Sequence, residues 1–172
     1  MLFKKSVMTA AVFAVGSFAV MSSANAAADN PVDSSFGMNV NVESVCTIVS
    51  APGEVTIGNI GAGLATAALQ TKTTILTLKC SEGAVPIVSL SPTGDSITGS
   101  GKMKFGGQEV NYQLTKSALI TDVWGSGESA YTLAAATKYA IPIETTIYAT
   151  VTDTADVKPG LYTDTVTVSV AY

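Results

Sequence analysis

The sequence predicts an all-β fold, an antiparallel β-sandwich, and two observations carry that prediction. Short segments of alternating apolar and polar residues follow one another along the chain, and Gly, Pro, Ser and Asp residues that favour turns separate them. No segment longer than a single turn repeats its apolar residues with the 3.6-residue period of a helix. Many short strands joined by such turns are typical of an antiparallel sandwich.

Each expected strand has alternating apolar residues or a β-rich composition. In the first, Phe36, Met38, Val40 and Val42 alternate with small or polar residues, and the strand leads directly into Cys46. Only helical turns are expected elsewhere, at 65–69 and 133–137. The expected strands are 36–42, 55–60, 73–80, 85–90, 102–105, 110–115, 118–124, 131–133, 138–151 and 162–172.

The last of these strands has the longest regular alternation in the chain. Small and polar residues occupy one parity, and the residues expected on the buried face occupy the other: Tyr162, Val166, Val168, Val170 and Tyr172. A sandwich in which this strand is the last element needs something to cover its outer edge. The cover must therefore come from an earlier part of the chain or from another chain.

Residues 1–26 are expected to be a signal peptide and not part of the fold. Lys4 and Lys5 precede an apolar run at 7–21, and Ala24-Asn25-Ala26 has the small-x-small pattern of a signal-peptidase site. The alternative is a retained membrane anchor, but the run is shorter than the roughly 20 residues that a bilayer span needs. Cleavage before Ala27 would leave 146 of the 172 residues in an exported protein.

The exported chain is acidic. Removing residues 1–26 takes away two of its 9 lysines, which leaves 7 basic against 13 acidic side chains and a net charge of −6. The sequence contains no arginine. Because nucleic acids and anionic membranes are bound mainly through Lys and Arg, neither is expected as a partner.

The chain has two cysteines, Cys46 and Cys80, and is expected to be exported. In an oxidising compartment, an even pair is most simply a disulfide, and here it would have a structural role. The alternatives are two free thiols, or a metal site that lacks its other ligands.

The residues needed for common enzyme chemistry are missing or dispersed. Histidine is absent, which excludes a Ser-His-Asp triad, a histidine metal cluster and a histidine general base. Asp153 and Asp156 lie in a polar loop and are expected to be solvated charges. We therefore expect no enzyme activity, no metal and no cofactor. A monomeric secreted binding module, for example for carbohydrate, with sugar stacking on Trp124 and Tyr131, stays open as an alternative function.

Three segments together resemble the spore coat protein U domain, the subunit type of archaic, Csu-type chaperone-usher pili. The first is the alternating strand that enters a cysteine, at 36–46. The second is Val110-Asn-Tyr-Gln-Leu114 followed by Val123-Trp-Gly-Ser-Gly127, a tyrosine strand that leads to a Trp-Gly turn. The third is the ending, from Pro159-Gly-Leu-Tyr162 to Tyr172. The resemblance spans essentially the whole exported chain.

This resemblance implies an incomplete immunoglobulin-like sandwich that lacks its seventh strand. Residues 27–43 would be an N-terminal extension whose donor strand, Phe36, Met38, Val40 and Val42, completes a neighbouring copy, and 44–172 would be the pilin domain. The last strand would flank the acceptor groove. The implied partners are a periplasmic chaperone, an outer-membrane usher and neighbouring subunits in a homopolymer. The implied destination, by way of the periplasm, is a cell-surface fimbria that supports adhesion and biofilm formation. The alternative for 36–42 is a first strand of the chain's own complete domain.

Overall fold

The computed structural model describes residues 33–64 and 69–172. The chain divides into two units, Met1–Val40 and Asn41–Tyr172. In the first unit, the described residues 33–40 are in no strand or helix. The signal peptide expected at 1–26 lies outside the described residues, as does most of the helical turn expected at 65–69. No described helix is long and apolar enough to cross a membrane.

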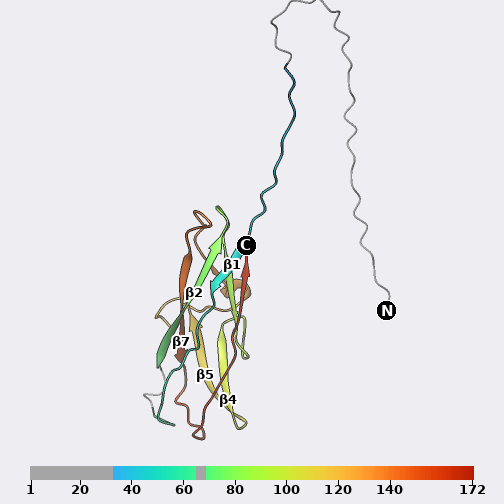
Figure 1. Cartoon of the computed structure of the whole chain (residues 1–172). Helices are drawn as coiled ribbons and strands as arrows, with labels where there is room; N and C mark the ends of the chain where they lie inside the picture. The colour runs from blue at the N-terminus through green and yellow to red at the C-terminus, as the bar shows by residue number, and fades with distance from the viewer. Residues whose placement is uncertain (1–32, 65–68) are drawn as a thin grey trace, which may run out of the picture. The chain divides into compact units, whose positions relative to one another are not determined.

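The larger sheet of the second unit has five antiparallel strands (Figure 1). Its spatial order is β1-β2-β7-β5-β4, which puts β2 and β7, the two longest strands, side by side near its centre. The strands are β1 (Cys46–Ser50), β2 (Thr71–Cys80), β7 (Ile143–Val151), β5 (Gln108–Thr115) and β4 (Ser100–Phe105).

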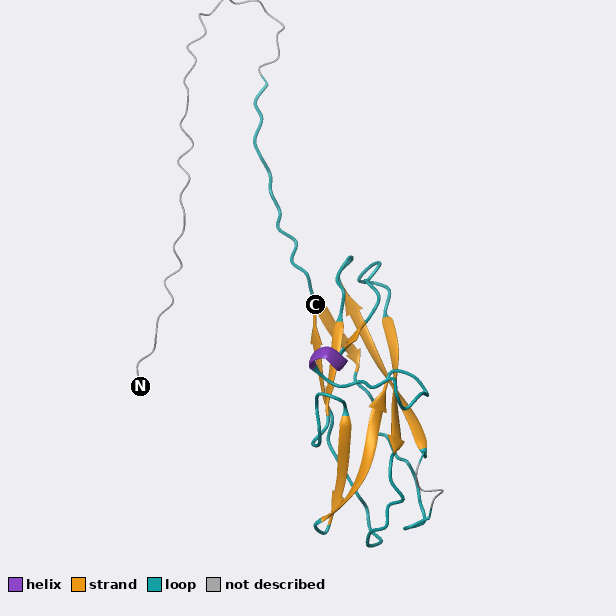
Figure 2. Ribbon diagram, turned by 180° about the vertical axis from the view of Figure 1, so that it is seen from behind, coloured by secondary structure: helices purple, strands orange, loops and turns teal. Residues whose placement is uncertain are grey.

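The smaller sheet has three antiparallel strands in the order β6-β3-β8. They are β6 (Tyr131–Thr132), β3 (Ile87–Ser91) and β8 (Thr167–Ala171). A short 3-10 helix, η2 (Gly127–Ser129), precedes β6 and is drawn in purple in Figure 2. The antiparallel β-sandwich predicted from the sequence is confirmed.

Alternation in the sequence decides which side chains form the core. In β2, Leu76, Leu78 and Cys80 are fully buried, and the residues between them face outward. The β-branched Thr and Ile residues that alternate with them suit a pleated, half-buried surface. The same period places Ile147, Ala149 and Val151 of β7 and Val110, Tyr112 and Leu114 of β5 in the interior.

Trp124 joins the two sheets on one side of the sandwich. Its backbone amide donates to the Leu114 carbonyl on β5 at 2.9 Å, and its fully buried indole Nε1 donates to the Val88 carbonyl on β3 at 2.9 Å. The next residue, Gly125, accepts from the Leu90 amide at 3.0 Å. A Cβ at position 125 would lie 2.1 Å from the Ile97 carbonyl oxygen, so the Trp-Gly pair at this link requires glycine.

Several expected elements differ from those observed. Residues 118–124 do not form a strand, because the Lys116 amide bonds to the Asp122 carbonyl and closes a turn. Residues 133–137 form no helical turn, and the short helix instead lies at η2. The strand β1 was not predicted, since its Ile48-Val49 pair breaks the alternation. The last strand begins at Thr167, five residues after the predicted start at Tyr162. Residues 36–42 and 55–60 lie in no strand.

The two cysteines form a disulfide, as predicted, and it connects two neighbouring strands. Cys46 opens β1 and is paired in register with Cys80, the last residue of β2, 34 positions later. Next to the disulfide, the Ser81 amide donates to the Val45 carbonyl at 2.8 Å. Because β1 is an edge strand that pairs only with β2 among the described strands, the disulfide fixes the start of the domain to its central strands.

We expect the double variant Cys46→Ser with Cys80→Ser to fold less stably than the parent chain. Opening a loop of 34 residues restores entropy to the unfolded chain, and the expected loss in the free energy of unfolding is about 3 to 4 kcal/mol. Urea denaturation of both proteins measures it, and reduction of the parent chain should give a similar loss. Equal midpoints for oxidised parent and variant would contradict the prediction.

Candidate functional site: an open groove between the sheets

The second unit contains a large groove with a volume of about 990 Å³. One wall is formed by the end of β1 and the segment that follows it, residues 48–60, and the other by residues 157–168, which lead into β8. In Figure 1 these walls are the teal segment below β1 and the red-brown segment below the C-terminus. The floor comes from both sheets: Leu90, Met103, Val110, Tyr112, Leu114, Ile147, Ala149 and Val151.

Among the described strands, β1 and β8 each have one free edge, and the wall before β8 carries the isolated bridge between Thr163 and Lys104 of β4. β8 is the last strand of its sheet and is paired only with β3 among the described strands. The segment 51–60 belongs to no strand, although Val55, Ile57 and Ile60 are half-buried and contact the core. Residues 55–60 therefore have the sequence pattern of a strand, but they pair with no described strand. Two walls with free strand edges over an apolar floor are the geometry into which an additional strand fits.

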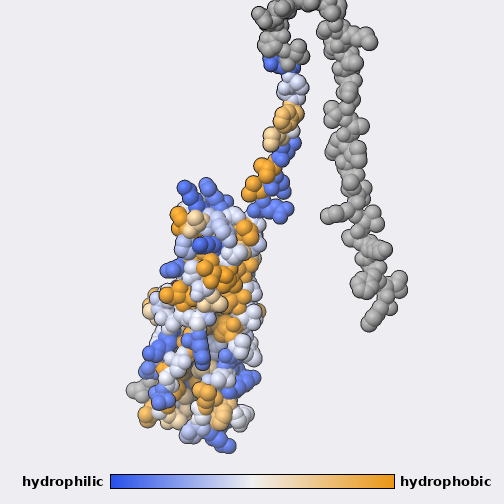
Figure 3. Space-filling view, viewed as in Figure 1, coloured by the Kyte–Doolittle hydropathy of each residue, from blue (hydrophilic) through white to orange (hydrophobic). Residues whose placement is uncertain are grey.

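The interior of the groove is apolar over most of its length. It meets two clusters of buried side chains, a larger one that contains Leu90, Leu114 and Ile147, and a smaller one around Val110, Val151 and Ala155. Figure 3 shows apolar residues gathered along the middle of the face of the second unit that is turned to the viewer. A large concave site lined mainly by apolar side chains is the usual geometry of a binding site.

Asp164 and Tyr112 place a polar contact inside this apolar groove. The Tyr112 hydroxyl donates to Asp164 Oδ2 at 2.7 Å, and Thr93 donates to the same carboxylate from both its hydroxyl and its backbone amide. The Thr165 amide donates to Oδ1 at 2.7 Å. Partial burial opposes ionisation, but these hydrogen bonds from Thr93, Tyr112 and Thr165 outweigh it and lower the pKa of the Asp164 carboxyl.

Tyr112 reaches Asp164 because its ring lies over a glycine on the neighbouring strand. Gly101 of β4 is paired in register with Tyr112 of β5, and a Cβ at Gly101 would lie 2.1 Å from the ring carbon Cζ. Burial, and then the adjacent Asp164 carboxylate, raise the pKa of the Tyr112 hydroxyl. The hydroxyl therefore stays protonated, as a donor, at physiological pH.

The residues predicted to flank the groove are not all in it. Val166 and Val168 are half-buried and line the groove, as does Tyr162, whose ring also contacts Phe105. Val170 packs against the larger core cluster. Tyr172, at the end of the same parity, is 57% exposed.

The four residues predicted to form a donor strand have exposed side chains. Phe36, Met38, Val40 and Val42 have exposed fractions of 83 to 87%. In Figure 3 the described part of this segment shows apolar residues separated by polar ones. Large apolar side chains that are this exposed and lie close together make the segment a candidate for contact with another surface.

Trp124 and Tyr131, which the binding-module alternative requires on the surface, are arranged differently. Trp124 is fully buried, and its ring meets that of Tyr131 edge-on at 5.1 Å. The indole is therefore part of the core and offers no face for a sugar to stack on. Within residues 33–64 and 69–172, no group of three or more His, Cys, Asp or Glu side chains is arranged to hold a metal ion.

Asp164, Tyr112 and Gly101 were not predicted from the sequence as members of the site. Asp164 stands between two threonines in a polar stretch, and its partners lie 52 and 71 positions away in the sequence. A weak signal existed in the carboxylate itself, because Asp disfavours strands and here interrupts the alternation of 162–172 at an inward-facing position.

Comparison with known proteins agrees with this geometry. A family model described as Spore Coat Protein U domain matches residues 32–169. Among solved structures, the chain is similar to a chain of the crystal structure of the CsuC-CsuE chaperone-tip adhesion subunit pre-assembly complex from archaic chaperone-usher Csu pili of Acinetobacter baumannii. The TM-score is 0.53 at 23% sequence identity, a likeness of fold, and it covers 76% of this chain and 40% of that chain. A search of curated proteins finds no match.

We expect Val168→Asp to destabilise the domain by several kcal/mol, because it places a carboxylate without a partner among buried apolar side chains. Val168 is paired with Leu90 in the smaller sheet and faces the groove. The control is Ser169→Asp, which adds the same charge on the exposed face of the same strand. Thermal melting should show a large loss for the first variant and little change for the second. Equal losses would mean that the two faces of β8 are assigned wrongly.

We expect Gly101→Ala to cost about 1 to 3 kcal/mol of stability, because the added methyl group forces the Tyr112 ring to move. Gly53→Ala is the matched control, since a Cβ there would meet only the Thr74 hydroxyl, at an ordinary 3.9 Å. Chemical denaturation of both variants measures the difference. A Gly101→Ala protein as stable as the Gly53→Ala protein would show that the ring has room to shift.

Proposed function

The chain belongs to the Spore Coat Protein U domain family, and we propose that it is a structural subunit of a surface fimbria assembled by the chaperone-usher pathway. The observation that carries this proposal is the open groove, which lacks one strand, in a chain whose N-terminal segment has the pattern of that strand. The segment of one subunit would fill the groove of the next, and repetition of this step would build a fibre.

The match in chemistry between groove and segment supports this assignment. The groove offers an apolar floor and two walls with free strand edges, and residues 36–42 offer four apolar side chains of one parity and a backbone free to pair. A strand added between the walls would gain backbone hydrogen bonds along its length and place every second side chain inward. Val166 and Val168 of the acceptor would then contact the donor side chains directly.

The free energy of such a contact suits a filament. Burying Phe36, Met38, Val40 and Val42 is worth roughly 1.5 to 3 kcal/mol each, or about 6 to 12 kcal/mol in total. These values are upper bounds, because the free segment already buries part of its apolar surface. An interaction of this size dissociates slowly, and a mechanical fibre requires slow dissociation at every joint.

The same groove defines the partners on the way to the surface. An apolar groove left empty in the periplasm would aggregate, so a periplasmic chaperone would fill it until an outer-membrane usher exchanges the chaperone for the next subunit. The similar solved structure is a chaperone–tip adhesion subunit complex from archaic chaperone-usher Csu pili. The product is a homopolymer at the cell surface that supports adhesion and biofilm formation.

Catalysis and sugar binding each have less support in the sequence and the structure than the function of a fimbrial subunit. We infer that the protein is not an enzyme, because its family and fold are those of structural subunits and the sequence contains no histidine. The alternative of a monomeric carbohydrate-binding module lacks its aromatic platform, since the Trp124 indole is buried.

We expect the mature chain to form polymers that resist SDS until heated, and Val40→Asp to abolish them. A carboxylate at position 40 would enter the apolar groove without a partner. The control is Asn39→Asp, which adds the same charge at the opposite parity, where the side chain points out of the groove. Electrophoresis of unheated samples should show a ladder for the parent and for Asn39→Asp only.

A parent chain that remains monomeric in this assay would favour the independent binding module. A ladder that survives Val40→Asp but not Asn39→Asp would mean that the opposite face of the segment enters the groove.

A further inference from the structure

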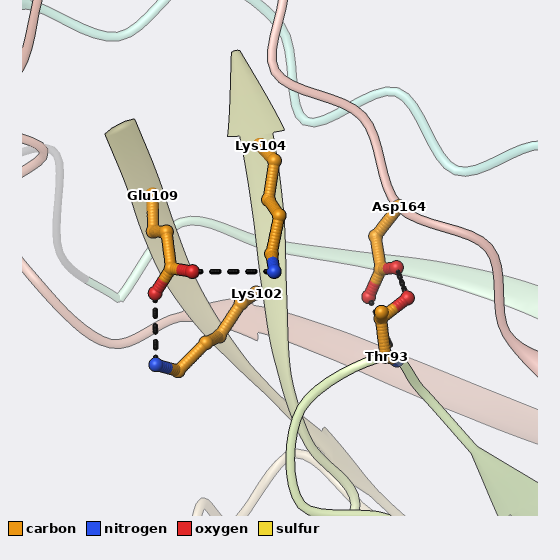
Figure 4. A network of polar contacts seen from close by, with 5 residues as sticks. All are labelled: Thr93, Lys102, Lys104, Glu109 and Asp164. Carbon is orange, nitrogen blue, oxygen red and sulfur yellow. Dashed lines mark hydrogen bonds and ion pairs between the residues drawn. The ribbon is translucent and has the colours of Figure 1, made fainter. Parts of the chain in front are cut away.

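The carboxylate of Asp164 connects three parts of the domain that the sequence keeps far apart. Asp164 lies in the wall that leads into β8, Tyr112 lies on β5 in the larger sheet, and Thr93 lies in the turn after β3. Figure 4 shows Thr93 directed at the Asp164 carboxylate. With the Tyr112 hydroxyl and the Thr165 amide, the carboxylate accepts from one tyrosine and two threonines.

This contact is one of several that hold the wall at 157–168 against the larger sheet. No described strand pairs with the free edge of β8. Other links are the Lys158 amide, which donates to Gln108 Oε1 at 2.7 Å, the edge-on rings of Tyr162 and Phe105, 5.6 Å apart, and the isolated bridge between Lys104 of β4 and Thr163, with backbone hydrogen bonds of 2.9 and 3.3 Å. Asp164 directly follows Thr163 in the chain. Its side chain and this bridge therefore hold adjacent residues of the wall to the larger sheet.

We propose that Asp164 is a positioning residue, which sets the distance between this wall and the larger sheet and so holds the empty groove ready for a strand. This inference rests on the proposed function, because it concerns how the groove binds its occupant. The hydrogen bond from Tyr112 connects the carboxylate to the larger sheet. Gly101 leaves room for the tyrosine ring, because it has no side chain. Without the carboxylate, only the bridge at Thr163 and the contacts of Tyr162 and Lys158 would hold the wall, so it would be less constrained, and each incoming strand would first have to restore its position.

Charge is part of the mechanism, since an ionised carboxylate accepts stronger hydrogen bonds than a neutral group. The same hydrogen bonds lower the pKa of Asp164, so that their contribution is complete above the ordinary pKa of Asp, about 3.9, and is lost as the pH falls through the lower pKa of the folded state. Binding of a strand should therefore weaken in acid. The other titratable side chains at the groove and at the adjacent bridge are Glu54, Lys104, Tyr112, Lys158 and Tyr162.

The test measures binding of a synthetic peptide of residues 32–43 to the full mature chain. All proteins carry Val40→Asp, so that none donates its own segment to another. We compare this parent with Asp164→Asn, with Tyr112→Phe, which keeps the ring but removes the donor, and with Glu109→Gln as control. Glu109 is a carboxylate on the adjacent hairpin, outside the groove, and its surface ion pairs with Lys102 and Lys104 measure 2.8 and 3.3 Å (Figure 4).

We expect the dissociation constant of the peptide to rise at least about tenfold in Asp164→Asn and in Tyr112→Phe, and to stay unchanged in Glu109→Gln. Below about pH 4, affinity should fall in the parent and in Glu109→Gln, whereas Asp164→Asn should lack this part of the pH profile. Melting of the unliganded proteins shows whether each variant is folded. Should Asp164→Asn fail to fold, Tyr112→Phe decides the affinity comparison.

Each outcome separates this inference from the function on which it rests. A parent that binds the peptide, with Asp164→Asn or Tyr112→Phe equally tight and an identical pH profile, would overturn the positioning role and leave the pilin assignment intact. A folded parent that does not bind the peptide at any concentration would overturn the assignment of the groove itself, and with it the role of Asp164.

Discussion

An apolar groove that its own domain leaves unfilled is the constraint on which the rest of this structure depends. A sandwich is stable when the inward faces of both sheets are covered, and here Leu90, Leu114, Ile147 and their neighbours open into about 990 Å³ of space along one side. These side chains are buried within the domain, but the groove above them is open, and the hydrophobic effect favours filling an apolar groove. In the proposed function a strand from another subunit fills it, so that fold and assembly would both depend on one element.

The domain must keep its shape while the groove is empty. Two sets of hydrogen bonds and one disulfide link its parts. Trp124 donates hydrogen bonds to both sheets, through its amide and its indole. On the open side, the Asp164 carboxylate connects the wall before β8 to Tyr112 and Thr93. At the entrance to the domain, the disulfide fixes Cys46 to the end of β2. These links are directional or covalent, and therefore keep their geometry without the packing that a complete core provides.

The sequence predicts those features that depend on residues close together in the chain, and it does not predict contacts between distant residues. The sandwich and β5 follow from period-two alternation, and β2 and β7 from a β-rich composition, because both signals belong to each strand separately. The segment 55–60 has the same pattern but forms no strand, because a ladder needs a neighbour and the neighbour is missing. The disulfide followed from counting cysteines in an exported chain. The Asp164 contact did not follow, because nothing near Asp164 in the sequence indicates that Tyr112 and Thr93, more than 50 positions away, supply its donors.

The same reasoning explains why the wall beside β8 contains a carboxylate at all. An apolar residue at position 164 would continue the alternation and bury more surface, but it would also favour collapse of the wall onto the floor of the empty groove. A carboxylate resists this, because moving it deeper would remove it from water and from its four donors. Asp164 therefore fixes the wall at one distance from the sheet. An incoming strand meets a groove whose width is already set, and the apolar residues around it supply the free energy of binding.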